Sequence, residues 1–270
     1  MVAPSLNGKP FQAVSFSGCG TLNFFQTGVA ASLQRAQLLE GKHLAGASAG
    51  SGLATFLAAG IDAEHVSETA IAFLAPFAGD NILRRPDIPI RFANHILDAF
   101  IDDDILDRIG DRVHISITSL TPPRRLKVNR FHGRDDLCSA IRASCHIPSR
   151  RYRSARFRGD RCVDGGFTQN TPLVGDRCLT VSPFAMSRHV DISPTRAINP
   201  LRAVVIPDPE RARALFARGL ADGDRYLERL ARGEVALKPK KTLRGDRDPS
   251  AVAAYGGQPL SREALPGMRP

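Results

Sequence analysis

The 270-residue sequence predicts an α/β domain in which helices pack against a central sheet. Short β-prone runs alternate with longer segments whose apolar residues recur at helical spacing, which is typical of layered α/β folds. Two of the early strands also end in glycine-rich turns that lead directly into helices. The chain is long enough for one large domain with a substantial core.

Each element follows from its local pattern. The predicted strands are short and either apolar throughout or alternate between apolar and polar residues, and the predicted helices carry an apolar stripe. Asp62 is expected to be the N-cap of one helix, and Pro148 follows the end of another. Pro122 and Pro123 are expected to turn the chain between two strands. We expect strands at residues 11–17, 43–47, 113–120, 126–131 and 177–181 and at the end of the run 150–166. We expect helices at residues 22–36, 48–59, 61–77, 90–100, 135–146 and 209–232.

Composition divides the chain into three parts and limits its partners. Residues 1–10 are expected to be a flexible N-terminus, 11–232 the folded domain, and 233–270 a basic, disordered tail. The net charge of +10 favours an anionic partner such as a membrane surface. The five cysteines form no CxxC pair, so we expect free thiols, a reducing compartment and no metal site. The N-terminus shows no signal peptide and no apolar run spans a bilayer, which predicts a cytoplasmic protein with the option of peripheral attachment to a membrane or lipid droplet.

A serine motif follows the second predicted strand. Residues 46–50 read GASAG, in which Ser48 lies between Gly46 and Gly50 at the junction of a strand and a helix. A sharp turn of this kind needs small neighbours, and the N–H groups at the start of the following helix favour negative charge near the hydroxyl. This arrangement is typical of a serine nucleophile.

The glycine turn after the first strand allows two interpretations, an anion site for acyl chemistry or a phosphate loop. Gly18, Cys19 and Gly20 would present successive backbone amides to an anion such as a tetrahedral acyl intermediate. A dinucleotide loop needs a third glycine where the chain has Asn23, and an acidic residue after the second strand, where it has the serine turn instead. The nucleotide interpretation therefore fails, and no cofactor or nucleic-acid partner is predicted.

An aspartate is the candidate base for the serine. Asp164 ends a predicted strand and is followed by Gly165 and Gly166, a sequence that by itself more often makes a turn. A buried carboxyl in an apolar setting has a raised pKa and becomes a better base, and several phenylalanines lie near the motifs in the sequence. The residues are Phe16, Phe24, Phe25 and Phe167.

Taken in order, SGCG at 17–20 with Gly28, GASAG at 46–50 and VDGG at 163–166 resemble the patatin-like phospholipase family. AIRASCHIP at 140–148, LTVSPF at 179–184 and NPLRAVVIPDPE at 199–210 resemble its branch with adipose triglyceride lipase and adiponutrin. The resemblance implies a three-layer αβα fold with a mainly parallel sheet. It also implies a Ser–Asp dyad without histidine, in which Ser48 is the nucleophile, Asp164 the base, and Gly18, Cys19 and Gly20 the oxyanion hole. The implied function is hydrolysis of acyl esters in acylglycerols or phospholipids, without cofactor or metal.

Three alternatives remain beside this interpretation. The same site becomes a transacylase when an acyl acceptor replaces water, and a relative with the fold but little turnover would act as a lipid-binding protein. His189 follows Asp164 in the order of a hydrolase triad, although its polar loop is more typical of a surface. Of the other polar residues, His43 and His146 are expected to be buried and structural, and Asp102, Asp103 and Asp104 to form a solvated helix cap.

A basic segment precedes the candidate base. Residues 150–161 contain six arginines and one aspartate. A solvated hairpin is the plain interpretation, and docking on an anionic membrane is the functional one, with Tyr152 and Phe157 adding shallow apolar contacts. The arginines that we expect at the membrane are Arg150, Arg151, Arg153 and Arg156.

Overall fold

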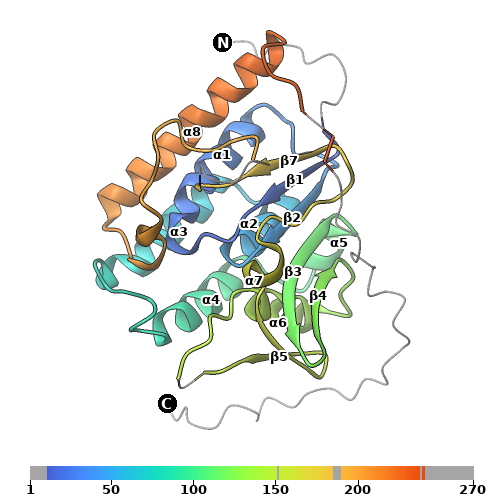
Figure 1. Cartoon of the computed structure of the whole chain (residues 1–270), viewed down its shortest axis with the longest axis vertical. Coiled ribbons are helices and arrows are strands. Elements are labelled where there is room, and N and C mark those ends of the chain that lie inside the picture. Colours follow the sequence, from blue (N-terminus) through green and yellow to red (C-terminus); the bar gives the residue numbers. More distant parts are fainter. Residues whose placement is uncertain (1–10, 151, 185–189, 238, 241–270) are drawn as a thin grey trace.

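The computed structural model describes residues 11–150, 152–184, 190–237 and 239–240, and it confirms an α/β fold around a mixed, mostly parallel sheet (Figure 1). The strand order is β5-β6-β3-β2-β1-β7, with β4 paired to β3 off this path. Strands β7, β1, β2 and β3 are parallel, whereas β4, β5 and β6 join by antiparallel pairing. The strands are β1 (Ala13–Phe16), β2 (His43–Ala47), β3 (Val113–Leu120), β4 (Pro123–Val128), β5 (Ala155–Phe157), β6 (Asp160–Asp164) and β7 (Cys178–Val181).

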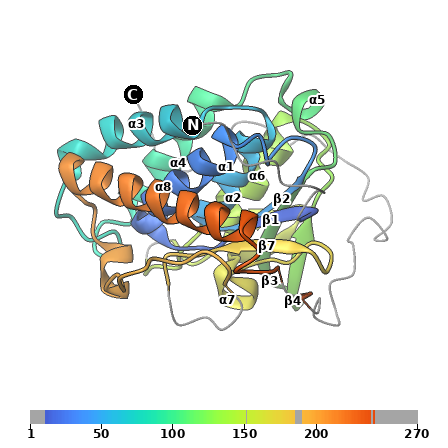
Figure 2. The same ribbon diagram turned by 90° about the horizontal axis from the view of Figure 1, so that it is seen from above.

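Most helices lie on one side of this sheet, and the short α7 lies on the other (Figure 2). Asp62 caps α3 as expected, because its carboxylate accepts a hydrogen bond of 2.9 Å from the His65 amide. The α-helices are α1 (Asn23–Arg35), α2 (Ala49–Ala58), α3 (Ala63–Leu74), α4 (Asp87–Phe100), α5 (Ile105–Ile109), α6 (Arg134–Ser144), α7 (Gly166–Gln169) and α8 (Pro209–Ala231). The 3-10 helices are η1 (Gly20–Leu22), η2 (Ala75–Phe77) and η3 (Pro200–Val204).

Close contact between α1 and α8, which lie side by side in both views, depends on glycine. A Cβ on Gly28 would lie 2.0 Å from the Phe216 carbonyl oxygen, and one on Gly219 would lie 1.9 Å from the Phe25 carbonyl oxygen. The two backbones therefore touch where any larger residue would separate them. Gly28 therefore serves the packing of these two helices.

Strand β3 brings the ends of two other strands together. Strand β4 pairs with β3 from Ile115 to Leu120. The residues of β3 that pair with β2 and with β6 overlap this stretch, so β2 and β6 must share the opposite edge of β3. The last residue of β2, Ala47, is opposite Ser116, and the last residue of β6, Asp164, is opposite Ile117. The two strands thus run toward each other and end at adjacent positions of β3.

Several boundaries differ from those expected. The partner strand predicted at 126–131 begins earlier, at Pro123, so only Pro122 remains in the turn. The short elements α5, α7 and η3 were not predicted, because one or two turns carry too few residues to show a period. The packed domain also extends past residue 232 to Lys240, whose ammonium group donates to the Cys178 carbonyl oxygen at 2.7 Å. Residues 1–10 and 241–270 lie outside the described residues.

Candidate active site

Ser48 occupies a strained turn between β2 and α2. Its φ of 52° and ψ of −131° place its backbone in a region that residues other than glycine rarely adopt. The neighbouring glycines are required by space, since a Cβ on Gly46 would lie 2.1 Å from the Gly50 carbonyl oxygen and one on Gly50 would lie 2.4 Å from that of Phe16. Ser48 is buried at 8% exposure and stands as the N-cap of α2, where the helix dipole favours negative charge.

Two further serines hold this turn in place. The Ser48 amide donates to Ser144 Oγ at 2.9 Å, and Ser144 Oγ donates in turn to the Ser116 carbonyl oxygen at 2.7 Å. Ser51 Oγ donates to the Ser48 carbonyl oxygen at 2.7 Å. Sequence reasoning assigned no role to Ser144 or Ser51, because nothing near either residue indicates its distant partner. Ser144 connects the turn to α6 and β3, and Ser51 ties it to the first turn of α2.

Asp164 lies beside Ser48, as the shared edge of β3 requires. The nearby Ser48 hydroxyl favours the ionised form of its carboxylate, and the Gly166 amide donates to Oδ1 at 2.7 Å. The Asp164 backbone is also fixed, since its amide donates to His146 O at 2.8 Å and its carbonyl accepts from Thr118 Oγ1 at 2.8 Å. Burial raises the pKa of Asp164 above its ordinary value, although the Ser48 hydroxyl and the Gly166 amide oppose part of that rise. The result is a carboxylate with more proton affinity than a solvated one.

The Gly18-Cys19-Gly20 turn approaches this pair from β1. A Cβ on Gly18 would lie 3.0 Å from Ser48 Cβ and 2.7 Å from Asn170 Oδ1, so the turn contacts the serine directly. The Gly18 amide donates to the Asn170 carbonyl oxygen at 3.0 Å. Cys19 is the N-cap of η1 and Gly20 its first residue, positions whose N–H groups have no acceptor within the helix.

Two thiols near the carboxylate are poor competitors for the role of nucleophile. Burial raises the pKa of the Cys19 thiol far above its usual value, and the charge of Asp164 adds to this effect. Burial and the same charge raise the pKa of Cys145 to about 12. Both groups are therefore protonated near neutral pH, and only the thiolate is strongly nucleophilic. All five cysteines are free, and no group of three His, Cys, Asp or Glu residues in the described chain is arranged to hold a metal.

The other candidate residues lie elsewhere or differ from expectation. His43 and His146 were expected to be buried but are only half-buried. Nδ1 of His43 lies 3.1 Å from Nε2 of His114. Phe16, Phe24 and Phe25 are buried. Phe167 is 67% exposed, so its ring does not contribute to the apolar surroundings expected for Asp164. His189 lies outside the described residues. The aspartates before α5 are exposed, and Asp102 pairs with Arg108 at 2.6 Å. In the ranges described, no helix is long and apolar enough to cross a membrane.

The basic segment contains arginines with and without an acidic partner. Arg158 pairs with Asp136 at 2.6 Å. Arg150, Arg153 and Arg156 are exposed and have no acidic partner among the described residues, whereas Arg151 lies outside them. Phe157 is buried at 3% exposure, so the expected apolar contact with a membrane through this ring is wrong.

Comparison with known proteins gives a consistent result. The family model described as patatin-like phospholipase matches residues 14–175. Mouse 1-acylglycerol-3-phosphate O-acyltransferase Pnpla3 is 30% identical over 179 residues, covering 64% of this chain and 43% of that protein. Human omega-hydroxyceramide transacylase is 29% identical over 197 residues, covering 67% of this chain and 35% of that protein. Human patatin-like phospholipase domain-containing protein 4 is 30% identical over 194 residues, covering 67% of this chain and 74% of that protein. The matched region is thus less than half of the first two relatives.

Proposed function

The chain belongs to the patatin-like phospholipase family, and we propose that it is a serine hydrolase that cleaves acyl esters of glycerolipids at Ser48. The observation that carries the proposal is the placement of the strained Ser48 and the buried Asp164, which follow and end strands β2 and β6 at adjacent positions of β3. Strain at a non-glycine residue persists where surrounding structure enforces it, as Ser144 and Ser51 do here. Such strain is commonly found at reactive residues.

In the first step, Ser48 Oγ attacks the ester carbonyl carbon while Asp164 accepts the hydroxyl proton. The carbonyl oxygen becomes an oxyanion, and we assign its donors to the N–H groups of Cys19 and Gly20 and the N-terminus of α2. Gly18 has a different role, because its N–H already donates to Asn170. Its missing side chain lets the turn approach Ser48. When the intermediate collapses, the carbon–oxygen bond to the alcohol breaks and Asp164 returns its proton to the leaving oxygen.

In the second step, water attacks the acyl-enzyme and Asp164 takes its proton. The new oxyanion collapses to release a carboxylic acid, and the proton returns to Ser48. An acceptor hydroxyl in place of water would give transacylation by the same steps, and two relatives are named for acyl transfer. Which acceptor prevails depends on whether it excludes water from the acyl-enzyme.

A carboxylate can replace histidine as base only when its proton affinity is raised. A solvated aspartate titrates near pH ~4 and is a poor proton acceptor at neutral pH. Burial raises the pKa of Asp164, which brings it nearer to that of a useful base. Both proton transfers then pass between Asp164 and an oxygen beside it, so no third residue is needed.

Labelling with a fluorophosphonate probe tests the proposal. We expect modification at Ser48 in the parent protein, none in Ser48→Ala, and strongly slowed labelling in Asp164→Asn, because the base is lost. Ser15→Ala is the matched control, since Ser15 is a fully buried serine whose hydroxyl has no partner in the described structure. Labelling of Ser48→Ala at the parent's rate would refute the assignment. Failure of the parent to label would indicate the lipid-binding relative instead.

Product analysis separates hydrolysis from transfer. Purified protein is incubated with a diacylglycerol, with and without excess monoacylglycerol as acceptor, and the products are quantified by mass spectrometry. Hydrolysis predicts free fatty acid in both reactions, in amounts that the acceptor changes little. The added monoacylglycerol carries an acyl chain of a different length from those of the donor. A mixed diacylglycerol with one chain from the donor and one from the acceptor, formed at the expense of fatty acid, would favour the transacylase.

A further inference from the structure

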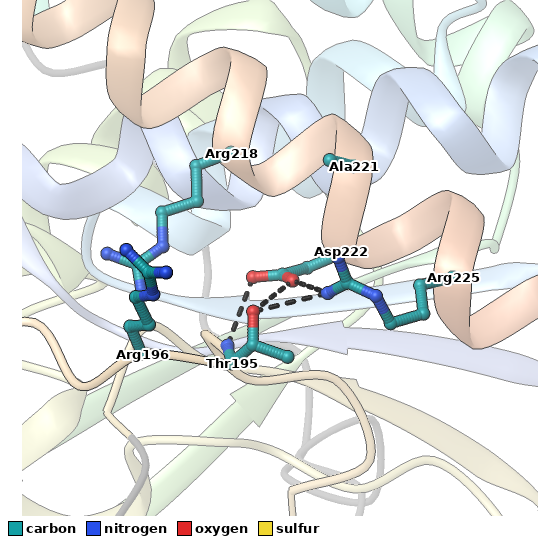
Figure 3. A pocket seen from close by; sticks show the side chains of 6 residues that line it. All are labelled: Thr195, Arg196, Arg218, Ala221, Asp222 and Arg225. Atoms are coloured by element: carbon teal, nitrogen blue, oxygen red, sulfur yellow. Dashed lines mark hydrogen bonds and ion pairs between the residues drawn. The ribbon is translucent and has the colours of Figure 1, made fainter.

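A cavity of about 590 Å³ lies between α8 and the segment before η3, away from the residues proposed for catalysis (Figure 3). It contains three arginines and one aspartate. Its lining residues are Thr195, Arg196, Arg218, Ala221, Asp222 and Arg225.

The aspartate in this cavity is fully engaged. Asp222 Oδ1 accepts from Arg225 Nη1 at 2.5 Å and from Thr195 Oγ1 at 2.6 Å, and Oδ2 accepts from the Thr195 amide at 3.1 Å. Arg225 balances its charge, and the Thr195 bonds fix the segment against α8. The network is therefore complete without any contribution from Arg196 or Arg218.

Arg196 and Arg218 have no such partner. Neither forms an ion pair with any described residue, and the buried Nη2 atom of Arg218 has no hydrogen-bond acceptor. Both side chains line the cavity, and their guanidinium groups overlap in the view of Figure 3, away from Asp222 and Arg225. Two like charges that line one cavity, one with an unsatisfied buried donor, are costly unless an anion offsets them.

We propose that Arg196 and Arg218 form a binding site for a phosphate group. Planar guanidinium forks bind phosphate oxygens in pairs, and a doubly charged phosphate would neutralise both arginines. Such a group would also supply the acceptor that Arg218 Nη2 lacks. Asp222 does not prevent this, because Arg225 and Thr195 occupy its oxygens.

Arg218 also borders a second cavity, of about 500 Å³, whose surface is mainly apolar. Leu22, Ile206 and Leu215 are among its lining residues. A phosphate beside an apolar cavity matches a phosphorylated lipid with one acyl chain better than it matches free phosphate. The second cavity also includes Thr21, directly after Gly20 in the proposed oxyanion turn, so an occupant there would contact the element that positions this turn.

Thermal unfolding with inorganic phosphate tests the shared chemistry. Ionic strength is held constant with sodium chloride, because exposed arginines attract any anion at low salt. We expect phosphate to raise the Tm of the parent. Arg196→Gln and Arg218→Gln should each weaken phosphate binding at least tenfold. Arg229→Gln is the matched control, since it removes the same charge from α8 beside Glu234 and should respond as the parent does.

Two features keep this test decisive. Arg196 is exposed, so Arg196→Gln should fold normally. Without phosphate, the Tm of Arg218→Gln should equal or exceed that of the parent, because a half-buried charge with an unsatisfied Nη2 donor has been removed and no ion pair is lost. An equal phosphate response in the parent and in both variants would overturn the proposal.

Calorimetric titration then distinguishes the source of the phosphate. Short-chain lysophosphatidate, the monoacylglycerol of the same chain length and inorganic phosphate are titrated into Ser48→Ala, so that turnover plays no part. Lysophosphatidate bound at least tenfold tighter than phosphate, with the gain lost in Arg218→Gln, indicates a lipid-borne group. Equal affinities for lysophosphatidate and phosphate, both dependent on Arg218, indicate free phosphate. Monoacylglycerol bound as tightly as lysophosphatidate, with or without Arg218, would overturn the proposal.

Discussion

Replacing Ser144 by alanine should disturb the turn around Ser48 without touching substrate. The change removes the acceptor of the Ser48 amide and the donor to the Ser116 carbonyl oxygen, two bonds of 2.9 and 2.7 Å in a fully buried position. A buried donor left unsatisfied costs about 1–3 kcal/mol. For a domain of this size, each kcal/mol lowers Tm by about 2–4 °C, so we expect a decrease of about 2–12 °C.

The effect on catalysis should exceed the effect on binding. With its amide unrestrained, Ser48 can relax from its strained conformation and move away from Asp164. A displacement near 1 Å lowers turnover on the order of 100-fold, so we expect a decrease in kcat of about 10–100-fold with a smaller change in KM. The assay is hydrolysis of a soluble short-chain ester below the Tm of the variant.

Ser15→Ala provides the control for this experiment, because it removes a buried hydroxyl that has no partner in the described structure. It should leave both Tm and kcat near the parent values. A Ser144→Ala protein with the parent's Tm and kcat would show that the two bonds neither support the fold nor position the nucleophile. A lower Tm with unchanged kcat would limit Ser144 to a structural role.

Three further predictions concern the base and the membrane. Because the pKa of Asp164 is raised, activity should be lost as the pH falls through a value above that of an ordinary aspartate, near ~4; an acid limb of kcat/KM at or below that value would contradict the assignment. Asp164→Asn should reduce turnover by orders of magnitude, whereas His189→Ala should change turnover little. Asp164→Asn should not lower Tm at pH 7, because the ionised buried carboxylate that it removes destabilises the fold at that pH. Equal losses in the two variants would favour a triad. Replacing Arg150, Arg151, Arg153 and Arg156 by glutamine should weaken binding to anionic vesicles and flatten its salt dependence while hydrolysis of a soluble ester stays unchanged; equal vesicle affinity at low salt would leave these arginines as ordinary surface.

Local patterns predicted much of the fold because most elements are long enough to show a period. The α/β class and the strand before Ser48 follow from apolar spacing and from the turn residues that separate elements. Long-range features left no such signal. Nothing near Ser144 indicates a bond to residue 48, and nothing near Phe167 shows that its ring faces solvent. In the sequence, nothing distinguishes Arg218 from the other arginines of this amphipathic helix. Its place beside Arg196 depends on the packing of α8 against the segment before η3.

The relation between Ser48 and Asp164 depends on a single strand, and this explains why two residues in distant motifs can act as a pair. Ser48 follows the β2 residue opposite Ser116, and its amide reaches the Ser116 carbonyl through Ser144. Asp164 is opposite Ile117, and its carbonyl accepts from Thr118. Both groups are thus held by three consecutive residues of β3, in the interior of the sheet. A mobile loop would let their separation vary, whereas adjacent positions on one buried strand fix it before substrate arrives. Because proton transfer requires the two oxygens to come within hydrogen-bonding distance, this shared strand would provide the preorganisation that the proposed Ser–Asp pair needs.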